Sequence, residues 1–171
     1  MTASSTVMIR KCQESDQRDV CELVVGIMAR EFPKEAATFP TQDLEDISTS
    51  YGQLGEAFFV ASINGKIVGT VGVKQEDKRT ALLRRLFVDS RYRREKIGSR
   101  LVERAVQFCR EVGYEELIFK TTSTMNSAVQ LCEKRGFIPK ARLELGPIQL
   151  LKFALFLKSE AALPQGKTVS S

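Results

Sequence analysis

Two spacings of apolar residues recur along this chain of 171 residues, one typical of strands and the other of helices. Short apolar runs predict strands over residues 7–12, 57–62, 66–73, 80–88, 117–119, 137–145 and 148–157. Apolar residues three or four positions apart predict helices over 20–30, 97–112 and 125–135, with a further short helix over 43–51. Residues 33–42, which include Pro33 and Pro40, predict a loop.

Turn residues indicate how these elements connect. Asn64-Gly65 lies between two apolar runs, and a two-residue hairpin turn of this kind needs positive φ at both central positions. We therefore expect strands 57–62 and 66–73 to pair antiparallel and strand 80–88 to extend the meander. The helix over 97–112 ends at Gly113 before strand 117–119, and a strand–helix–strand succession predicts parallel strands joined by a right-handed crossover.

The element order βααβββαβαββ predicts a single α/β (α+β) domain over residues 1–158. A chain of this length with 43% hydrophobic residues can bury one sizeable core, whereas two domains would be cramped. Residues 159–171 contain Pro164, Gly166 and small polar residues, so we expect a disordered C-terminal tail.

A basic turn separates strand 80–88 from the helix over 97–112. Arg93, Arg94 and Lys96 lie in this turn, and Gly98 opens the helix. The first backbone N–H groups of a helix have no partner inside the helix and carry partial positive charge, so this turn is a candidate anion site. The alternative is an ordinary connection with a solvated basic surface.

Composition narrows the classes of function. The net charge of +5 is moderate and concentrated near the basic turn, without interleaved aromatic residues, which argues against nucleic-acid binding and for a small anionic ligand. The chain has no histidine, and its four cysteines are scattered, so neither a metal site nor a disulfide framework is expected. The longest apolar run is far shorter than the roughly 20 residues that span a membrane. We expect a reduced, cytoplasmic protein.

The chain resembles the GCN5-related N-acetyltransferases over residues 7–157. The resemblance rests on residues 93–99, which are similar to the acyl-CoA signature of that family, on Leu86-Phe87-Val88 before it, and on the element order. Residues 126–137 also resemble the family helix that begins with Asn and ends with Gly-Phe. The resemblance implies the acyl-CoA N-acyltransferase fold, with a mixed, mostly antiparallel sheet flanked by helices. It also implies acetyl-CoA as co-substrate, direct attack by a small-molecule or peptide amine in a ternary complex, and a homodimer.

The resemblance also implies which residues bind the cofactor. The end of strand 80–88, at Phe87 and Val88, would pair with the pantetheine arm. The pyrophosphate would lie on the turn and first helical residues, namely Arg93, Arg94, Glu95, Lys96, Ile97, Gly98 and Ser99. Asn126 matches a position that contacts the pantetheine; the alternative is a polar residue in the first turn of a helix.

Two positions depart from the family pattern. Lys96 replaces the first signature glycine, and its Cβ could hold the pyrophosphate away from the backbone. If Lys96 adopts helical φ/ψ, however, the N–H groups stay accessible and its ammonium can reach a phosphate oxygen, so we expect binding to survive. Cys132 stands where many relatives carry a tyrosine that protonates the departing thiolate. It is a candidate general acid, and the alternative is a small residue that packs the helix.

A general base is not identified by the sequence. Relatives often carry a glutamate near the start of the strand that ends at Val88, but this chain has Leu82 and Leu83 there. Glu31, Glu35 and Tyr51 are possible replacements, but a solvated surface position is the favoured interpretation of each, and none is assigned as the base. The missing glutamate and tyrosine keep open a second function, an acyl-CoA-binding sensor module of the same fold without catalysis.

Overall fold

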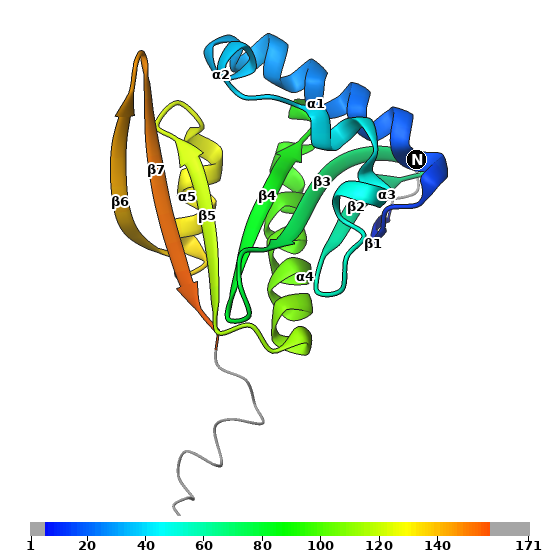
Figure 1. Ribbon diagram of the computed structural model, residues 1–171. Coiled ribbons are helices and arrows are strands. Elements are labelled where there is room, and N and C mark those ends of the chain that lie inside the picture. The colour runs from blue at the N-terminus through cyan, green and yellow to red at the C-terminus, as the bar shows by residue number, and fades with distance from the viewer. Residues whose placement is uncertain (1–5, 158–171) are drawn as a thin grey trace, which may run out of the picture.

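The computed structural model describes residues 6–157, except for the side chains of Arg94 and Glu95. The predicted C-terminal tail lies outside the described residues. Within them, a seven-stranded sheet has the strand order β1-β2-β3-β4-β5-β7-β6 (Figure 1). The strands are β1 (Val7–Lys11), β2 (Ala57–Ile63), β3 (Lys66–Gln75), β4 (Thr80–Val88), β5 (Glu116–Thr122), β6 (Ile138–Leu145) and β7 (Ile148–Phe156). All neighbouring strands are antiparallel except β4 and β5.

Helices cover both faces of the sheet. Their bounds are α1 (Gln17–Glu31), α2 (Pro33–Thr38), α3 (Ile47–Ser50), α4 (Ile97–Val112) and α5 (Asn126–Lys134), with 3-10 helices η1 (Glu14–Asp16), η2 (Gln42–Glu45) and η3 (Ser90–Glu95). Adjacent strand residues point to opposite faces. Phe58 on β2 packs with α1 and α3, whereas Phe59 packs with α4. The expected mixed, mostly antiparallel fold is therefore confirmed.

Two local expectations were wrong. Residues 33–42 were expected to form a loop, but α2 begins at Pro33. Proline stops α1 and also suits the first position of the next helix, where its missing N–H has no helical partner to lose. The single helix expected over residues 43–51 is instead the 3-10 helix η2 followed by the one-turn helix α3.

Strands β4 and β5 pair only over their first halves. Thr80–Leu83 of β4 align with residues 116–119 of β5, and the register stops there. The pairing of β4 with β3 also shifts between Thr70 and Gly72, where Arg85 has a left-handed φ of 52°. Such a bulge bends a strand and releases backbone groups from the ladder. The ends of β4 and β5 therefore diverge, which Figure 1 shows as a gap that widens toward α2.

Candidate functional site

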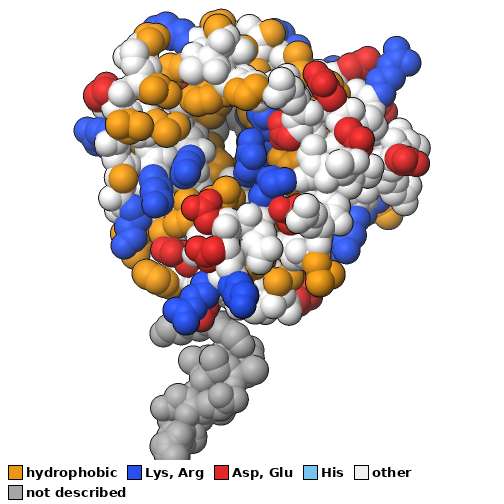
Figure 2. Space-filling model, in the orientation of Figure 1, with side chains coloured by type: hydrophobic (Ala, Val, Ile, Leu, Met, Phe, Trp, Pro, Cys, Tyr) orange, Lys and Arg blue, Asp and Glu red, His pale blue; other side chains and the backbone are white. Residues whose placement is uncertain are grey.

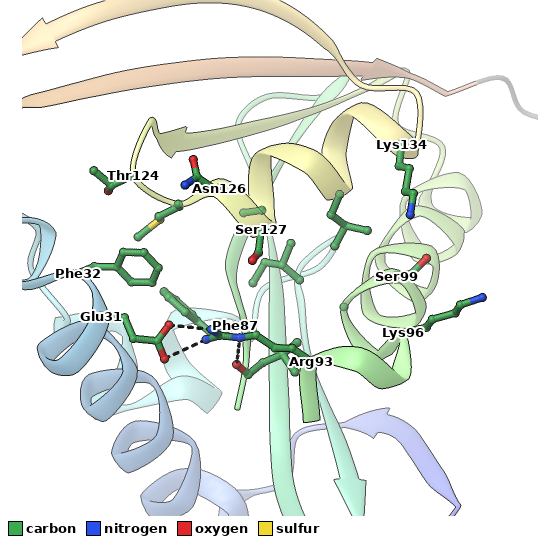
Figure 3. Close-up of a pocket in the computed structure, with 16 residues that line it drawn as sticks. Glu31, Phe32, Phe87, Arg93, Lys96, Ser99, Thr124, Asn126, Ser127 and Lys134 are labelled. Atoms are coloured by element: carbon green, nitrogen blue, oxygen red, sulfur yellow. Dashed lines mark hydrogen bonds and ion pairs between the residues drawn. The ribbon is translucent and has the colours of Figure 1, made fainter. Parts of the chain in front are cut away.

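A cavity of about 600 Å³ lies where β4 and β5 diverge (Figure 3). Its wall combines the end of β4, the start of α4, one side of α5 and the end of α1. The lining residues are Glu31, Phe32, Leu86, Phe87, Val88, Arg93, Lys96, Gly98, Ser99, Thr124, Met125, Asn126, Ser127, Ala128, Leu131 and Lys134. Residues from distant parts of the sequence thus meet in one cavity.

The start of α4 supplies backbone donors to this cavity. No side chain caps the helix, and the first recorded bond within it runs from the Arg100 N–H to the Lys96 carbonyl. The preceding N–H groups of Ile97, Gly98 and Ser99 have no carbonyl one turn earlier in the helix. Gly98 and Ser99 line the cavity, whereas the Ile97 side chain is buried in the core. The helix end is therefore suited to an anion.

Gly98 allows α4 to approach α5 closely. A Cβ at this position would lie 3.1 Å from Leu131 Cδ2 and 3.6 Å from Val88 Cγ2. Leu131 and Val88 also line the cavity. A larger residue at position 98 would press on the cavity wall as well as approach a bound ligand.

Lys96 does not adopt the helical φ/ψ that was the stated condition for keeping the N–H groups accessible. Its φ of 61° and ψ of 25° are left-handed, and it forms the N-cap of α4. A residue with a Cβ is strained there, which explains why glycine suits this position. In Figure 3 the Lys96 side chain extends away from Phe87 and Arg93. Lys96 nevertheless lines the cavity, at the N-terminus of α4.

Arg93 is held by two partners. Its guanidinium lies 2.8 Å from Glu31 at the end of α1, and its Nε–H donates to the Val88 carbonyl at 3.0 Å (Figure 3). Arg93 lines the cavity, but part of its charge is balanced by Glu31. The contact joins the end of α1 to the end of β4.

Asn126 begins α5 and lines the same cavity, beside Ser127. Phe87 and Val88 line it from β4. The structure therefore brings together most residues expected to bind the cofactor. The Ile97 side chain lies elsewhere, in the core, and the side chains of Arg94 and Glu95 are not described.

Cys132 lies on the other side of α5. Its side chain is fully buried in the core and does not line the cavity, whereas its neighbour Leu131 does. Burial raises the pKa of the Cys132 thiol to about 12. This position favours the packing alternative for Cys132.

A second cavity, of about 370 Å³, lies on the α1 face of the sheet between β4 and β5. It shares Leu86, Phe87, Met125 and Ala128 with the first cavity. The two cavities thus meet where the strands separate. Arg84, Arg85 and Lys120 line it together with apolar residues. The sequence placed Arg84 and Arg85 in a local basic patch that favours an anionic ligand, but it assigned neither of them, nor Lys120, to a site.

Arg85 is fixed by a buried network. Its guanidinium contacts Asp43 at 2.6 Å and 2.9 Å, and it donates to the Pro40 carbonyl at 2.9 Å. The Tyr51 hydroxyl donates to the same carboxylate at 2.6 Å. Burial of Asp43 opposes its charged form, but the hydrogen-bond donors outweigh that effect, and the pKa of Asp43 is lowered. Burial raises the pKa of Tyr51, and its hydrogen bond to Asp43 adds to this effect. Tyr51 is therefore a buried hydrogen-bond donor.

Glu35 is also buried, contrary to the surface position considered for it. Its carboxylate accepts hydrogen bonds from the hydroxyl groups of Thr122 and Thr124, at 2.7 Å and 2.5 Å. Burial favours the neutral acid, but the two threonines outweigh it, and the pKa of Glu35 is lowered. Glu35 lines neither cavity and instead joins α2 to the end of β5.

The chain matches the model of the acetyltransferase (GNAT) family over residues 22–137 and therefore belongs to that family. It is 34% identical to a probable N-acetyltransferase, camello, of Xenopus tropicalis, over 74% of this chain and 58% of that protein. It is 40% identical to human N-acetyltransferase 8, over 56% of this chain and 44% of that protein. The chain thus spans about half the length of these curated relatives.

Solved structures share the fold. A GNAT acetyltransferase from Staphylococcus aureus superposes with a TM-score of 0.79 at 26% identity, covering 90% of this chain and all of that one. A putative acetyltransferase from Salmonella typhimurium with acetyl-CoA as cofactor has a TM-score of 0.76 at 17% identity, covering 91% of this chain and 96% of that one. In the part of this chain that the structure describes, no helix is long and apolar enough to cross a membrane.

Proposed function

We propose that this protein transfers the acetyl group of acetyl-CoA to a primary amine by direct attack in a ternary complex. The observation that carries the proposal is the junction of the two cavities at Leu86, Phe87, Met125 and Ala128. One cavity would admit the thioester and the other the amine, so that the reacting atoms meet between β4 and β5. Holding two reactants together in this way supplies a large part of a rate enhancement.

The residues of the first cavity fit the chemistry of coenzyme A. Its pyrophosphate is an anion, and the start of α4 offers backbone N–H groups beside Lys96 and Lys134. Its pantetheine arm carries amides, for which Asn126 and the unpaired edge of β4 beyond Leu83 provide hydrogen-bonding groups. Acetyl-CoA would supply the activated acetyl group.

In the reaction, the amine nitrogen forms a bond to the acetyl carbonyl carbon and the carbon–sulfur bond breaks. The amine loses a proton and the thiolate gains one. Backbone N–H groups near Val88 would stabilise negative charge that develops on the carbonyl oxygen. The thiol leaving group has a pKa of about 8.5, so a dedicated acid assists the reaction near pH 7 but is not obligatory.

The alternative is a module that binds acyl-CoA without catalysis. Two observations favour it: Cys132 is buried away from the cavity, and no described residue that lines the second cavity is Asp or Glu. The chain also has no histidine. Under this alternative, acetyl-CoA binds and no acceptor is acetylated.

A two-part experiment tests the proposal. Calorimetry measures acetyl-CoA binding, and a thiol reagent follows release of free CoA in the presence of a panel of amines. Binding with amine-dependent thiol release supports the enzyme, and binding without release supports the sensor module. Absence of binding contradicts both functions.

A further inference from the structure

The second cavity has a distinctive charge. Three cations line it, Arg84, Arg85 and Lys120, and none of the described lining residues is acidic. We infer that the acceptor is an amine that also carries a carboxylate and an apolar side chain, as an apolar α-amino acid does. This inference rests on the proposed function, because it names the substrate class of that same site.

Arg84 and Lys120 are the cations available to a ligand. Arg85 is already paired with Asp43 at 2.6 Å, whereas Arg84 and Lys120 form no ion pair with a described residue. The positive charge of Arg84 acts electrostatically on Asp43 and Tyr51, and it favours the charged form of each. Their charges are therefore free to attract a carboxylate.

The strand register places these two cations on the same face of the sheet. Leu82 of β4 aligns with Ile118 of β5, and Arg84 and Lys120 each follow two residues later. Alternation directs residues i and i+2 to one face. Figure 2 shows basic side chains beside a hollow near the centre of this face. A carboxylate in the hollow would thus meet positive charge from both strands.

The remaining walls of this cavity are mainly apolar. Met28 and Phe39 approach from α1 and the segment after α2, and Ile118 and Leu150 from the sheet. A polyamine would bring further positive charge next to Arg84 and Lys120, and it has no carboxylate of its own to balance them. An apolar side chain would instead gain from burial.

The same cations assist the chemistry. Nearby positive charge disfavours an ammonium group and lowers its pKa, which increases the fraction of amine that can attack. Arg84 and Lys120 would also neutralise the acceptor carboxylate, which otherwise holds the proton on the neighbouring amine. The cavity could then act without an acidic side chain as base. Arg84 and Lys120 are thus specificity-determining residues.

Matched acceptors test this inference. L-phenylalanine and phenethylamine differ only in the carboxylate, as do L-leucine and isopentylamine. We expect kcat/KM to be at least tenfold higher for each amino acid. Arg84→Gln and Lys120→Gln should each lower this preference several-fold, and Arg84→Lys should retain part of it. Arg110→Gln, an exposed change on α4, is the control and should leave the preference intact. Equal kcat/KM within each pair would overturn the inference.

Product binding provides a readout that does not need turnover. With CoA saturating, N-acetyl-L-phenylalanine should bind at least tenfold more tightly than N-acetylphenethylamine, and Arg84→Gln should remove the difference. Equal affinity, or binding of neither compound, overturns the acceptor class while leaving acetyl-CoA binding intact. Failure to bind acetyl-CoA at all instead contradicts the proposed function.

Discussion

Arg85 and Asp43 form a buried, two-pronged ion pair that holds β4 at its bulge, with contacts of 2.6 Å and 2.9 Å. Only 8% and 14% of the two side chains are exposed. Arg85 has a left-handed φ, so the pair fixes a residue that would otherwise relax. The Arg85–Asp43 pair therefore stabilises the bulge at which β4 diverges from β5, and with it the junction of the two cavities.

Asp43→Asn should destabilise the protein strongly. It leaves the buried Arg85 charge without its counter-ion, a change that typically costs about 3–5 kcal/mol. Denaturant unfolding measures the loss. Asp19→Asn, an exposed change on α1, is the matched control and should alter stability by less than about 0.5 kcal/mol.

The double variant Asp43→Asn with Arg85→Gln should recover part of the stability lost in Asp43→Asn, because no unpaired charge remains. A loss for Asp43→Asn as small as that of the Asp19 control would contradict the structural role of this pair.

Lys96→Gly should stabilise the protein by about 1 kcal/mol. The substitution removes a left-handed strain of about 1–2 kcal/mol and costs some backbone entropy in exchange. Lys78→Gly, in the turn between β3 and β4 where no positive φ is recorded, should give no such gain. Thermal unfolding compares the two.

Acetyl-CoA titration of Lys96→Gly tests whether the lysine side chain obstructs binding of the pyrophosphate. We expect the Kd to change by less than tenfold, because the side chain extends away from the cavity wall at Phe87. A gain above about tenfold, roughly 1.4 kcal/mol, would show that the lysine obstructs the pyrophosphate.

Gly98→Ala should weaken acetyl-CoA binding by tenfold or more. The new Cβ would lie 3.1 Å from Leu131 and push that side chain into the cavity. Adding Leu131→Ala should restore part of the affinity. Gly26→Ala on α1 is the control, since its Cβ meets only the flexible end of Arg30. Unchanged affinity in Gly98→Ala would show that the contact with Leu131 has no effect on the cavity.

Cys132→Ala should lower stability by about 1 kcal/mol and leave kcat unchanged. The thiol is buried in the core, with its pKa raised to about 12, so its removal creates a small cavity in the protein interior. Unfolding and steady-state kinetics separate the two effects. A fall in kcat of more than tenfold with unchanged acetyl-CoA affinity would support the acid role instead.

Asp89 should contribute stability that is lost in acid. It is buried, accepts hydrogen bonds from the Arg91 side chain and backbone, and its pKa is lowered to about 2 by these contacts, with Arg91 as the main cause. Because the folded-state pKa lies below the unfolded value, the contribution is complete above about pH 4 and disappears as the pH falls toward 2. Asp89→Asn should lose about 1–2 kcal/mol at pH 7 and much less at pH 2.5. An equal loss of unfolding free energy at both pH values would show that the charge of Asp89 does not contribute to stability.

The sequence predicted the fold well because local signals were consistent with one another. Asn64-Gly65 does form the hairpin turn, with positive φ at both residues, and Gly113 ends α4. Helix α2 was missed because Pro33 can either end one helix or begin the next, and only the packing of the region decides between these uses.

The sequence predicted that the residues of the first cavity would lie together, but it did not predict that the cations of the second cavity would meet. Phe87, Gly98 and Asn126 lie close to recognisable motifs, so their shared cavity followed from the order of elements. Arg84 and Lys120 come together only because β4 and β5 lie side by side, which no local pattern reveals. Likewise, Thr122, which donates a hydrogen bond to Glu35, is 87 residues away from it in the sequence.

Amine-dependent release of free CoA from acetyl-CoA is the most direct test of the central claim, that transfer occurs where the two cavities meet. We predict that the wild-type protein releases thiol only when an amine acceptor is present. Ala128→Leu, which narrows the junction, should abolish release, while Ala37→Leu on the exposed surface of α2 should not. Release that does not depend on the amine, or that persists in a folded Ala128→Leu variant, would contradict the account.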